Sequence, residues 1–338
     1  MRRVFQILIW TLLGLAFLLP SVLDAYVRSR VPGGRACLYW GTREIPWHLN
    51  EAGATGITDG SDMTAVVNSF ETWNEPACSD ISFQLKGLTN RRDVGYVEGA
   101  HNNINLVVFR DSLCSEVVPP DDPCWACVDS GGACCSSAYG CWEHAPGAIA
   151  ITTTTFHRST GLLVDADIEL NEARYLFTTT DGPPCEDGPT TNTCTVDEEC
   201  APHQACMRGR CRTRGCAHTD IANTMTHEVG HVLGFDHTAE PEATMYASAS
   251  LGETKKRELH EVDILGLCEV YPVDGPTLTC LGDVILMEPL EPVDANPNWM
   301  GCSAGRADGG LAAFLLILAV WPMRRLCRQG GFEPERAK

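Results

Sequence analysis

Basic residues are scarce in this sequence of 338 residues. It has 25 lysines and arginines against 44 aspartates and glutamates, which gives a formal net charge of -19. Such a chain would be repelled by a phosphate backbone rather than neutralise it, so the charge argues against nucleic acid as a partner. No tandem repeat stands out either. The acidic balance favours solubility.

Cysteine, by contrast, is abundant, with 18 residues. This number is too large for a reducing compartment unless the cysteines bind metal, and their spacings vary too much for one repeated metal module. The N-terminus agrees with export, because Arg2 and Arg3 precede an apolar run over residues 4–19 and the small Ala25 suits cleavage. We predict a signal peptide over residues 1–25, with an uncleaved membrane anchor as the alternative.

The C-terminus also carries a sequence pattern that indicates membrane attachment. Gly301 and Cys302 precede an apolar run over residues 311–321, which is followed by three arginines, Arg324, Arg325 and Arg328. This order resembles the C-terminal sorting tails of myxobacterial surface proteins, and the arginines should stay on the cytoplasmic side. The resemblance implies processing or lipid attachment at Cys302, whereas a plain transmembrane anchor is the alternative. We expect an exported protein that is anchored at the cell surface or outer membrane, or secreted.

Between these ends, the apolar pattern predicts one α+β domain. A helix is expected over residues 62–73, with Val66, Phe70 and Trp73 on one face behind a cap at Ser61 or Asp62. Residues 104–109 are apolar enough for a central strand. Further strands are expected near residues 47–49, 81–83 and 147–156.

Two cysteine-rich stretches interrupt this domain, at about residues 114–141 and 182–216. Neither can build a core alone, so we expect disulfides to hold both. A zinc knuckle over Cys124 to Cys135 is the alternative for the first stretch. The second has the composition of small growth-factor-like modules, and is either a binding insertion or a rigid loop.

The segment from His227 to His237 fits the pattern H-E-x-x-H-x-x-G-x-x-H at every fixed position. Residues four apart on a helix share one face, so His227 and His231 can offer two imidazole nitrogens to one zinc ion. Gly234 permits the turn that ends the helix and brings His237 round as the third ligand. Three protein ligands leave one position for water, which is the open arrangement of a catalytic zinc.

Glu228 follows the first of these histidines and is offset from it around the helix. Its carboxylate can therefore meet the zinc-bound water instead of the metal. We expect it to act as the general base and then to protonate the leaving amine. The pattern predicts a zinc endopeptidase.

Residues 243–246, which include Met245, resemble the Met-turn of metzincins, specifically of the matrixin-like branch. Thr238, directly after the third histidine, also suits matrixins, and the resemblance spans about residues 37–272. It implies a twisted mixed sheet, an active-site helix beneath it and a small C-terminal subdomain after Gly234. It also implies that Met245 forms an apolar floor under the zinc.

The sequence departs from animal matrixins in several places. Cys37 lacks the Pro-Arg-Cys-Gly context of a thiol latch, and the ligand runs for calcium and a second zinc are not recognisable. Asp165, Asp167 and Glu169 lie in a stretch that resembles the strand before the active-site helix. They could touch calcium, but alternating acids are more typical of a solvated strand face. We therefore expect one catalytic zinc, and calcium is possible but unsupported.

These observations divide the chain into a signal peptide over residues 1–25, a matrixin-like domain over 26–272, a linker over 273–300 and a sorting tail over 301–338. The predicted substrates are proteins or peptides that pair as extended strands with residues 148–156. One alternative is a surface adhesion or binding protein on the same scaffold, against which the retained glutamate argues. Another is a zinc amidase that acts on cell-wall peptide. The sequence predicts no oligomeric state.

Overall fold

The structure is a computed structural model that describes residues 26–126, 134–185, 193–207 and 209–280. The predicted signal peptide, the linker beyond Cys280 and the sorting tail with Cys302 lie outside these ranges. Within them, no helix combines the length and the apolar character needed to cross a bilayer.

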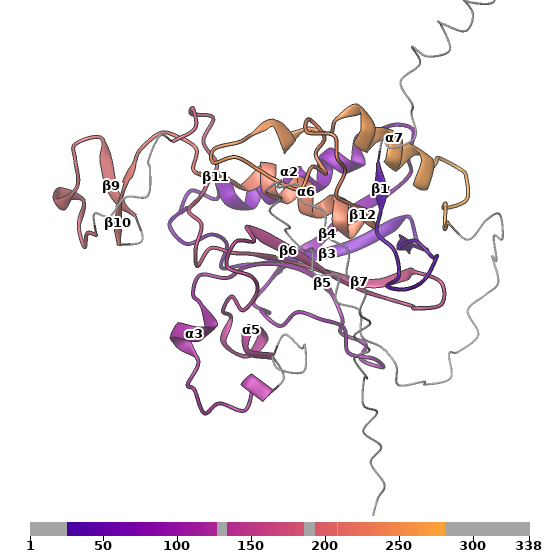
Figure 1. Cartoon of the computed structure of the whole chain (residues 1–338), viewed down its shortest axis with the longest axis horizontal. Coiled ribbons are helices and arrows are strands. Elements are labelled where there is room, and N and C mark those ends of the chain that lie inside the picture. The colour runs from indigo at the N-terminus through magenta and orange to yellow at the C-terminus, as the bar shows by residue number, and fades with distance from the viewer. Residues whose placement is uncertain (1–25, 127–133, 186–192, 208, 281–338) are drawn as a thin grey trace, which may run out of the picture. The chain divides into compact units, whose positions relative to one another are not determined.

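A mixed sheet of six strands forms the centre of the domain (Figure 1). Its strands are β2 (Tyr39–Trp40), β3 (Glu44–Asn50), β4 (Ser82–Thr89), β5 (Asn105–Phe109), β6 (Ala150–Phe156) and β7 (Leu162–Leu170). All pairs are parallel except β6 with β7, which is antiparallel. The apolar β5 lies between β3 and β7, so its predicted central position is confirmed.

Two helices cover one face of this sheet, α2 (Ser61–Asn74) and α6 (Ile221–Val232) (Figure 1). The predicted apolar face of α2 is buried, because Val66, Phe70 and Trp73 are at most 2% exposed. The Phe70 ring stacks on a tryptophan of β3 with centroids 3.8 Å apart. Trp73 Nε1 donates to Thr226 O at 2.8 Å, which ties α2 to α6. The helix pair and the sheet thus enclose one core.

The predicted cap of α2 is wrong. Gly60 occupies the N-cap position with a φ of 78°, and no side chain caps the helix. Ser61 Oγ instead hydrogen-bonds Thr179 Oγ1 at 2.6 Å, and Asp62 Oδ2 accepts from Ala54 N at 2.8 Å. Both candidate side chains bind other segments, so they do not accept hydrogen bonds from the free backbone amides of the first helical turn.

Short elements complete the described chain. Three two-stranded sheets pair β1 with β12, β8 with β11 and β9 with β10. The bounds of these elements are β1 (Val27–Arg28), α3 (Cys114–Val117), α5 (Cys134–Tyr139), β8 (Phe177–Thr178), η2 (Asp197–Glu199), β9 (Gln204–Met207), β10 (Arg210–Thr213), β11 (Thr219–Asp220), β12 (Phe235–Asp236), η3 (Lys255–Arg257) and α7 (Glu261–Val270).

Seven disulfides staple the described chain, which confirms that disulfides hold both cysteine-rich stretches. They are Cys37–Cys280, Cys78–Cys268, Cys114–Cys141, Cys124–Cys135, Cys185–Cys216, Cys194–Cys206 and Cys200–Cys211. The zinc-knuckle alternative is wrong for Cys124 and Cys135, because these two are bonded to each other. The bond to Cys37 holds residues 273–280 on the domain, past the boundary expected at residue 272.

The second cysteine-rich stretch is a small module with its own hairpin, β9–β10. One disulfide closes its base and two fasten the hairpin. Next to that base, Pro184 forms a bridge with Ala217, and Gly252 N donates to His218 O at 2.6 Å. The module is therefore tied at its base to the loop that follows Met245.

The face of β7 that carries Asp165, Asp167 and Glu169 is buried, so the predicted solvated face is wrong. Each of the three acids is at most 2% exposed. Asp167 accepts hydrogen bonds from Gly95 N at 2.5 Å and Leu106 N at 2.8 Å. Burial raises the pKa of Asp165, beside Asp167, to about 7. The segment that contains Gly95 thus donates to the carboxylate of Asp167, which the alternation alone places in water.

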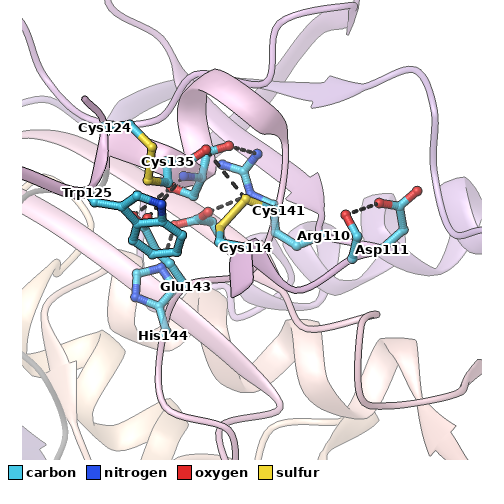
Figure 2. Close-up of a disulfide and its surroundings, with 12 residues drawn as sticks. Arg110, Asp111, Cys114, Cys124, Trp125, Cys135, Cys141, Glu143 and His144 are labelled. Carbon is cyan, nitrogen blue, oxygen red and sulfur yellow. Dashed lines mark hydrogen bonds and ion pairs between the residues drawn. A yellow bond between two sulfur atoms is a disulfide. The ribbon is translucent and has the colours of Figure 1, made fainter. Parts of the chain in front are cut away.

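A buried ion pair fastens the first cysteine-rich stretch to this face. Arg110 Nε lies 2.6 Å from Glu169 Oε2, both side chains are at most 1% exposed, and Arg110 Nη1 donates to Ser136 O at 3.1 Å. His144 Nε2 lies 2.9 Å from the second oxygen of Glu169. Figure 2 shows Arg110 and His144 close to Cys114–Cys141 and Cys124–Cys135, two disulfides in the described part of this stretch. The ionic cluster therefore links the stretch to the sheet.

His144 makes the stability of this link depend on pH. Burial lowers the pKa of His144, but the hydrogen bond and charge of Glu169 outweigh it, so the pKa is raised. A raised folded-state pKa stabilises the fold fully below the unfolded pKa of about 6.5, and this stabilisation is lost as pH rises through the folded value. We expect His144→Gln to destabilise the protein by about 1–3 kcal/mol at about pH 5.5 and by less at about pH 9. Thermal unfolding at both pH values checks this, and an equal loss at both would contradict it.

Candidate metal centre

Helix α6 begins at Ile221 because the preceding residue caps it. Asp220 Oδ1 accepts from Asn223 N at 2.8 Å, and Asp220 also pairs with Arg257 Nη2 at 2.6 Å. A carboxylate suits the N-terminus of a helix because it satisfies free amides there. Most of α6 is buried, including His227 and Glu228. The helix therefore carries polar groups into the core, where they need partners.

The chain reverses sharply after α6 and returns with the third histidine. Gly234 has a φ of 85°, and a Cβ there would lie 2.4 Å from Leu38 O. Only glycine accepts both the left-handed backbone and the close approach. The next two residues form β12, which pairs with β1, and His237 follows directly. The predicted turn at Gly234 thus lies where His237 needs it.

The structure brings the three predicted ligands together. His237 Nε2 lies 3.2 Å from His227 Nε2 and 3.2 Å from His231 Nε2. Nitrogens about 2.0–2.1 Å from a tetrahedral zinc lie about 3.3–3.4 Å apart. Two sides of the triangle of imidazole nitrogens are therefore close to the spacing that one zinc ion requires.

The other ring nitrogens fix which atoms face the centre. His227 Nδ1 lies 2.6 Å from Thr244 O, and His231 Nδ1 lies 2.8 Å from Phe235 O. A carbonyl oxygen only accepts, so each Nδ1 carries the proton and each Nε2 presents a lone pair. The lone pairs of His227 Nε2 and His231 Nε2 therefore both face His237 Nε2, which is the arrangement that a shared metal ion requires.

Burial also keeps the histidines uncharged. It lowers the pKa of His227 well below the usual value, and the neighbouring His231 lowers it further. Burial likewise lowers the pKa of His231 and of His237. Neutral imidazole is the form that binds metal, so the donor set fits zinc.

Met245 lies against the helix that carries two of the histidines. It is 3% exposed, and a Cβ on Gly230 would lie 2.2 Å from its sulfur. The glycine thus gives the thioether room to pack against α6. That Met245 forms an apolar floor under the zinc stays a prediction.

Asp263 holds the turn that contains Thr244 and Met245, and the sequence patterns did not indicate this role. Asp263 Oδ2 accepts from Thr244 N at 2.7 Å, and Asp263 Oδ1 accepts from Met245 N at 3.2 Å. The Met245 amide belongs to the same peptide group as Thr244 O, which His227 Nδ1 contacts. Asp263 therefore holds the peptide group whose carbonyl, Thr244 O, orients the His227 ring. The resemblance covers the segment around Asp263 but gives no signal for this role.

Lys256 is a second residue that the sequence did not reveal. It is 2% exposed, and its Nζ donates to Tyr246 O and to Ser248 O, the latter at 2.9 Å. Burial lowers its pKa. A buried ammonium that donates to two carbonyls holds the loop after Met245 in one conformation.

Glu228 lies beside the first histidine and is 6% exposed. Burial raises its pKa, while a hydrogen bond from Thr152 opposes this shift. Thr152 Oγ1 lies 2.6 Å from Glu228 Oε2. A carboxylate with a raised pKa suits a general base, because its pKa moves toward neutral pH.

The acids of β7 do not join this centre. Glu169 is paired with Arg110 and His144, and both oxygens of Asp167 accept from backbone amides. Among the described residues, the groups whose ligand atoms lie close enough to share an ion do not include these acids. The two other such groups contain disulfide cysteines, which leaves the three histidines as the donor set.

A cavity of about 1200 Å³ lies elsewhere, between α2 and the start of α6. Ser69, Asp220 and Arg257 are among its lining residues, and none of the three histidines is. The chemistry of the donor set, and not concave shape, therefore identifies the site.

Asp263→Asn tests the link from Asp263 to His227. The substitution removes one of two carboxylate oxygens that accept backbone amides, so the Thr244 carbonyl is held less firmly. We expect the dissociation constant for zinc to rise about 10- to 100-fold. Competition with a fluorescent chelator measures it, with the exposed Asp121→Asn as a control. An unchanged zinc affinity in Asp263→Asn would rule the link out.

Comparison with known proteins agrees with this geometry. Residues 148–272 match the model of the matrixin family, and this range runs from just before β6 to just after α7. It contains all three histidines, Glu228 and Met245. No curated protein matches the chain. The match supports a matrixin-like metalloprotease, a family that normally binds zinc.

Proposed function

We propose that this protein is an exported zinc endopeptidase in which His227, His231 and His237 hold one zinc ion and Glu228 is the general base. The convergence of three imidazole nitrogens, two of them 3.2 Å from the third, carries this proposal. A structural zinc site would use a fourth protein ligand. Among the described residues, no fourth ligand atom joins the three histidines, and the buried Glu228 directly follows His227 in the sequence.

When bound, zinc supplies Lewis acidity, which activates water and polarises the scissile carbonyl. A residue of the chain carries out the proton transfers. Glu228 accepts a proton from the attacking water and then donates it to the leaving amine. Its burial excludes bulk water, which would otherwise compete for the carboxylate.

The edge of the sheet offers a surface for an extended substrate. β6 pairs with β7 on one side, and no other strand of the described chain pairs with it. Thr152 of β6 contacts Glu228, so the strand passes the general base. We infer that a peptide adds to the free edge of β6 and so presents its carbonyl groups to the site.

The seven disulfides support an oxidising compartment, where such bonds form and persist. Export by the signal peptide over residues 1–25 is consistent with them. Membrane attachment through the tail and processing at Cys302 stay predictions from the sequence.

Cleavage of a quenched fluorescent peptide library by the zinc-loaded, oxidised protein tests the proposal. We expect the wild type to cut, and Glu228→Ala to lower kcat by at least about 100-fold while zinc content is unchanged. A chelator should abolish cleavage and added zinc should restore it. If the folded, zinc-loaded wild type cuts no peptide, the endopeptidase proposal fails. A panel of cell-wall peptides then separates a zinc amidase from a binding protein.

A further inference from the structure

The inward face of β6 carries hydroxyl groups where a buried strand face normally carries apolar side chains. Thr152 and Thr154 are 8% and 4% exposed. Alternate residues of a strand share one face, so both belong to the face on which Thr152 meets α6. Burying a hydroxyl without a partner costs free energy, so each one calls for an explanation.

The two hydroxyls have different surroundings. Thr154 Oγ1 is buried and has no hydrogen-bond partner among the residues that the structure describes. Thr152 Oγ1 lies 2.6 Å from Glu228 Oε2 and 3.1 Å from Glu228 O. Both atoms of Glu228 can only accept, so the single hydroxyl proton of Thr152 is donated to them, with the shorter contact to the carboxylate.

This donor is held in place before any substrate arrives. Threonine is stiff at χ1 because its Cβ is branched. Seven residue pairs join β6 to β7, so the backbone under Thr152 is fixed by the sheet. Helix α6 is fixed in turn by Trp73. The hydroxyl therefore reaches Glu228 from a rigid neighbour.

We propose that Thr152 is a positioning residue for Glu228, whose hydroxyl engages Oε2 and so leaves Oε1 as the oxygen that takes the proton from the attacking water. The inference rests on the proposed function, in which Glu228 is the general base. It predicts that loss of this hydroxyl slows the chemical step and leaves peptide and zinc binding intact. A merely structural role would instead lower stability or zinc content.

Three variants of the full chain test this. Thr152→Val removes the hydroxyl at nearly constant shape, Thr152→Ser keeps it, and Thr154→Val removes the neighbouring hydroxyl that has no partner. We expect kcat of Thr152→Val to be at least about tenfold lower than that of Thr154→Val, with KM and zinc affinity close to wild type. Thr152→Ser should recover most of the lost kcat. Equal kcat values for the two valine variants, or no recovery with serine, would overturn the inference.

Crystal structures of the zinc-loaded wild type and Thr152→Val test the contact without any substrate. The wild type should show a Glu228 oxygen within hydrogen-bond distance of Thr152 Oγ1, and Thr152→Val should show the carboxylate turned away. A wild type in which Glu228 bonds elsewhere overturns the inference, even if the protein cuts peptides. If the wild type cuts nothing, the proposed function fails separately, and the two structures alone decide the placement of Glu228.

Discussion

Three neutral imidazoles can be held with their lone pairs facing a common point only if the surrounding structure forces them there. The backbone supplies this constraint. Thr244 O and Phe235 O each take an Nδ1 proton, at 2.6 and 2.8 Å, so the Nε2 atoms are directed inward. Phe235 is held in turn by its pairing with Arg28 in the short sheet of β1 and β12. The candidate site therefore depends on segments from both ends of the described chain.

The same need to satisfy buried polar groups recurs outside the site. Asp167 accepts hydrogen bonds from two backbone amides, and Glu169 pairs with Arg110 and His144. In the interior, a paired carboxylate is tolerated where an unpaired one would be costly. These partners belong to segments that lie far from β7 in the sequence. Two disulfides, Cys114–Cys141 and Cys124–Cys135, hold the stretch that lies between Arg110 and His144.

Local patterns predicted part of this structure well. The spacing of Val66, Phe70 and Trp73 indicated α2 and its buried face, and the apolar run at residues 104–109 indicated a central strand. The spacing of the three histidines indicated that they converge at one candidate metal centre, because a helical repeat and one glycine turn decide their geometry. Such features depend on residues close together in the sequence.

Other features depend on distant partners, and the sequence did not reveal them. The alternation of acids along β7 is typical of a solvated strand face. In the structure, however, these acids are buried beneath the segment that contains Gly95 and beside Arg110. Ser61 was expected to cap α2, but Thr179 engages its hydroxyl. Thr152 lies in a run of four threonines over residues 152–155, and nothing in the run shows which hydroxyl meets a glutamate 76 residues away.

X-ray absorption at the zinc edge of the purified protein decides whether three imidazoles hold the metal, since it counts and identifies the atoms around it. We predict one zinc per chain, surrounded only by nitrogen and oxygen at about 2.0–2.1 Å, with the multiple-scattering signature of three imidazoles. A sulfur shell at about 2.3 Å, or a folded protein that takes up no zinc, would contradict it.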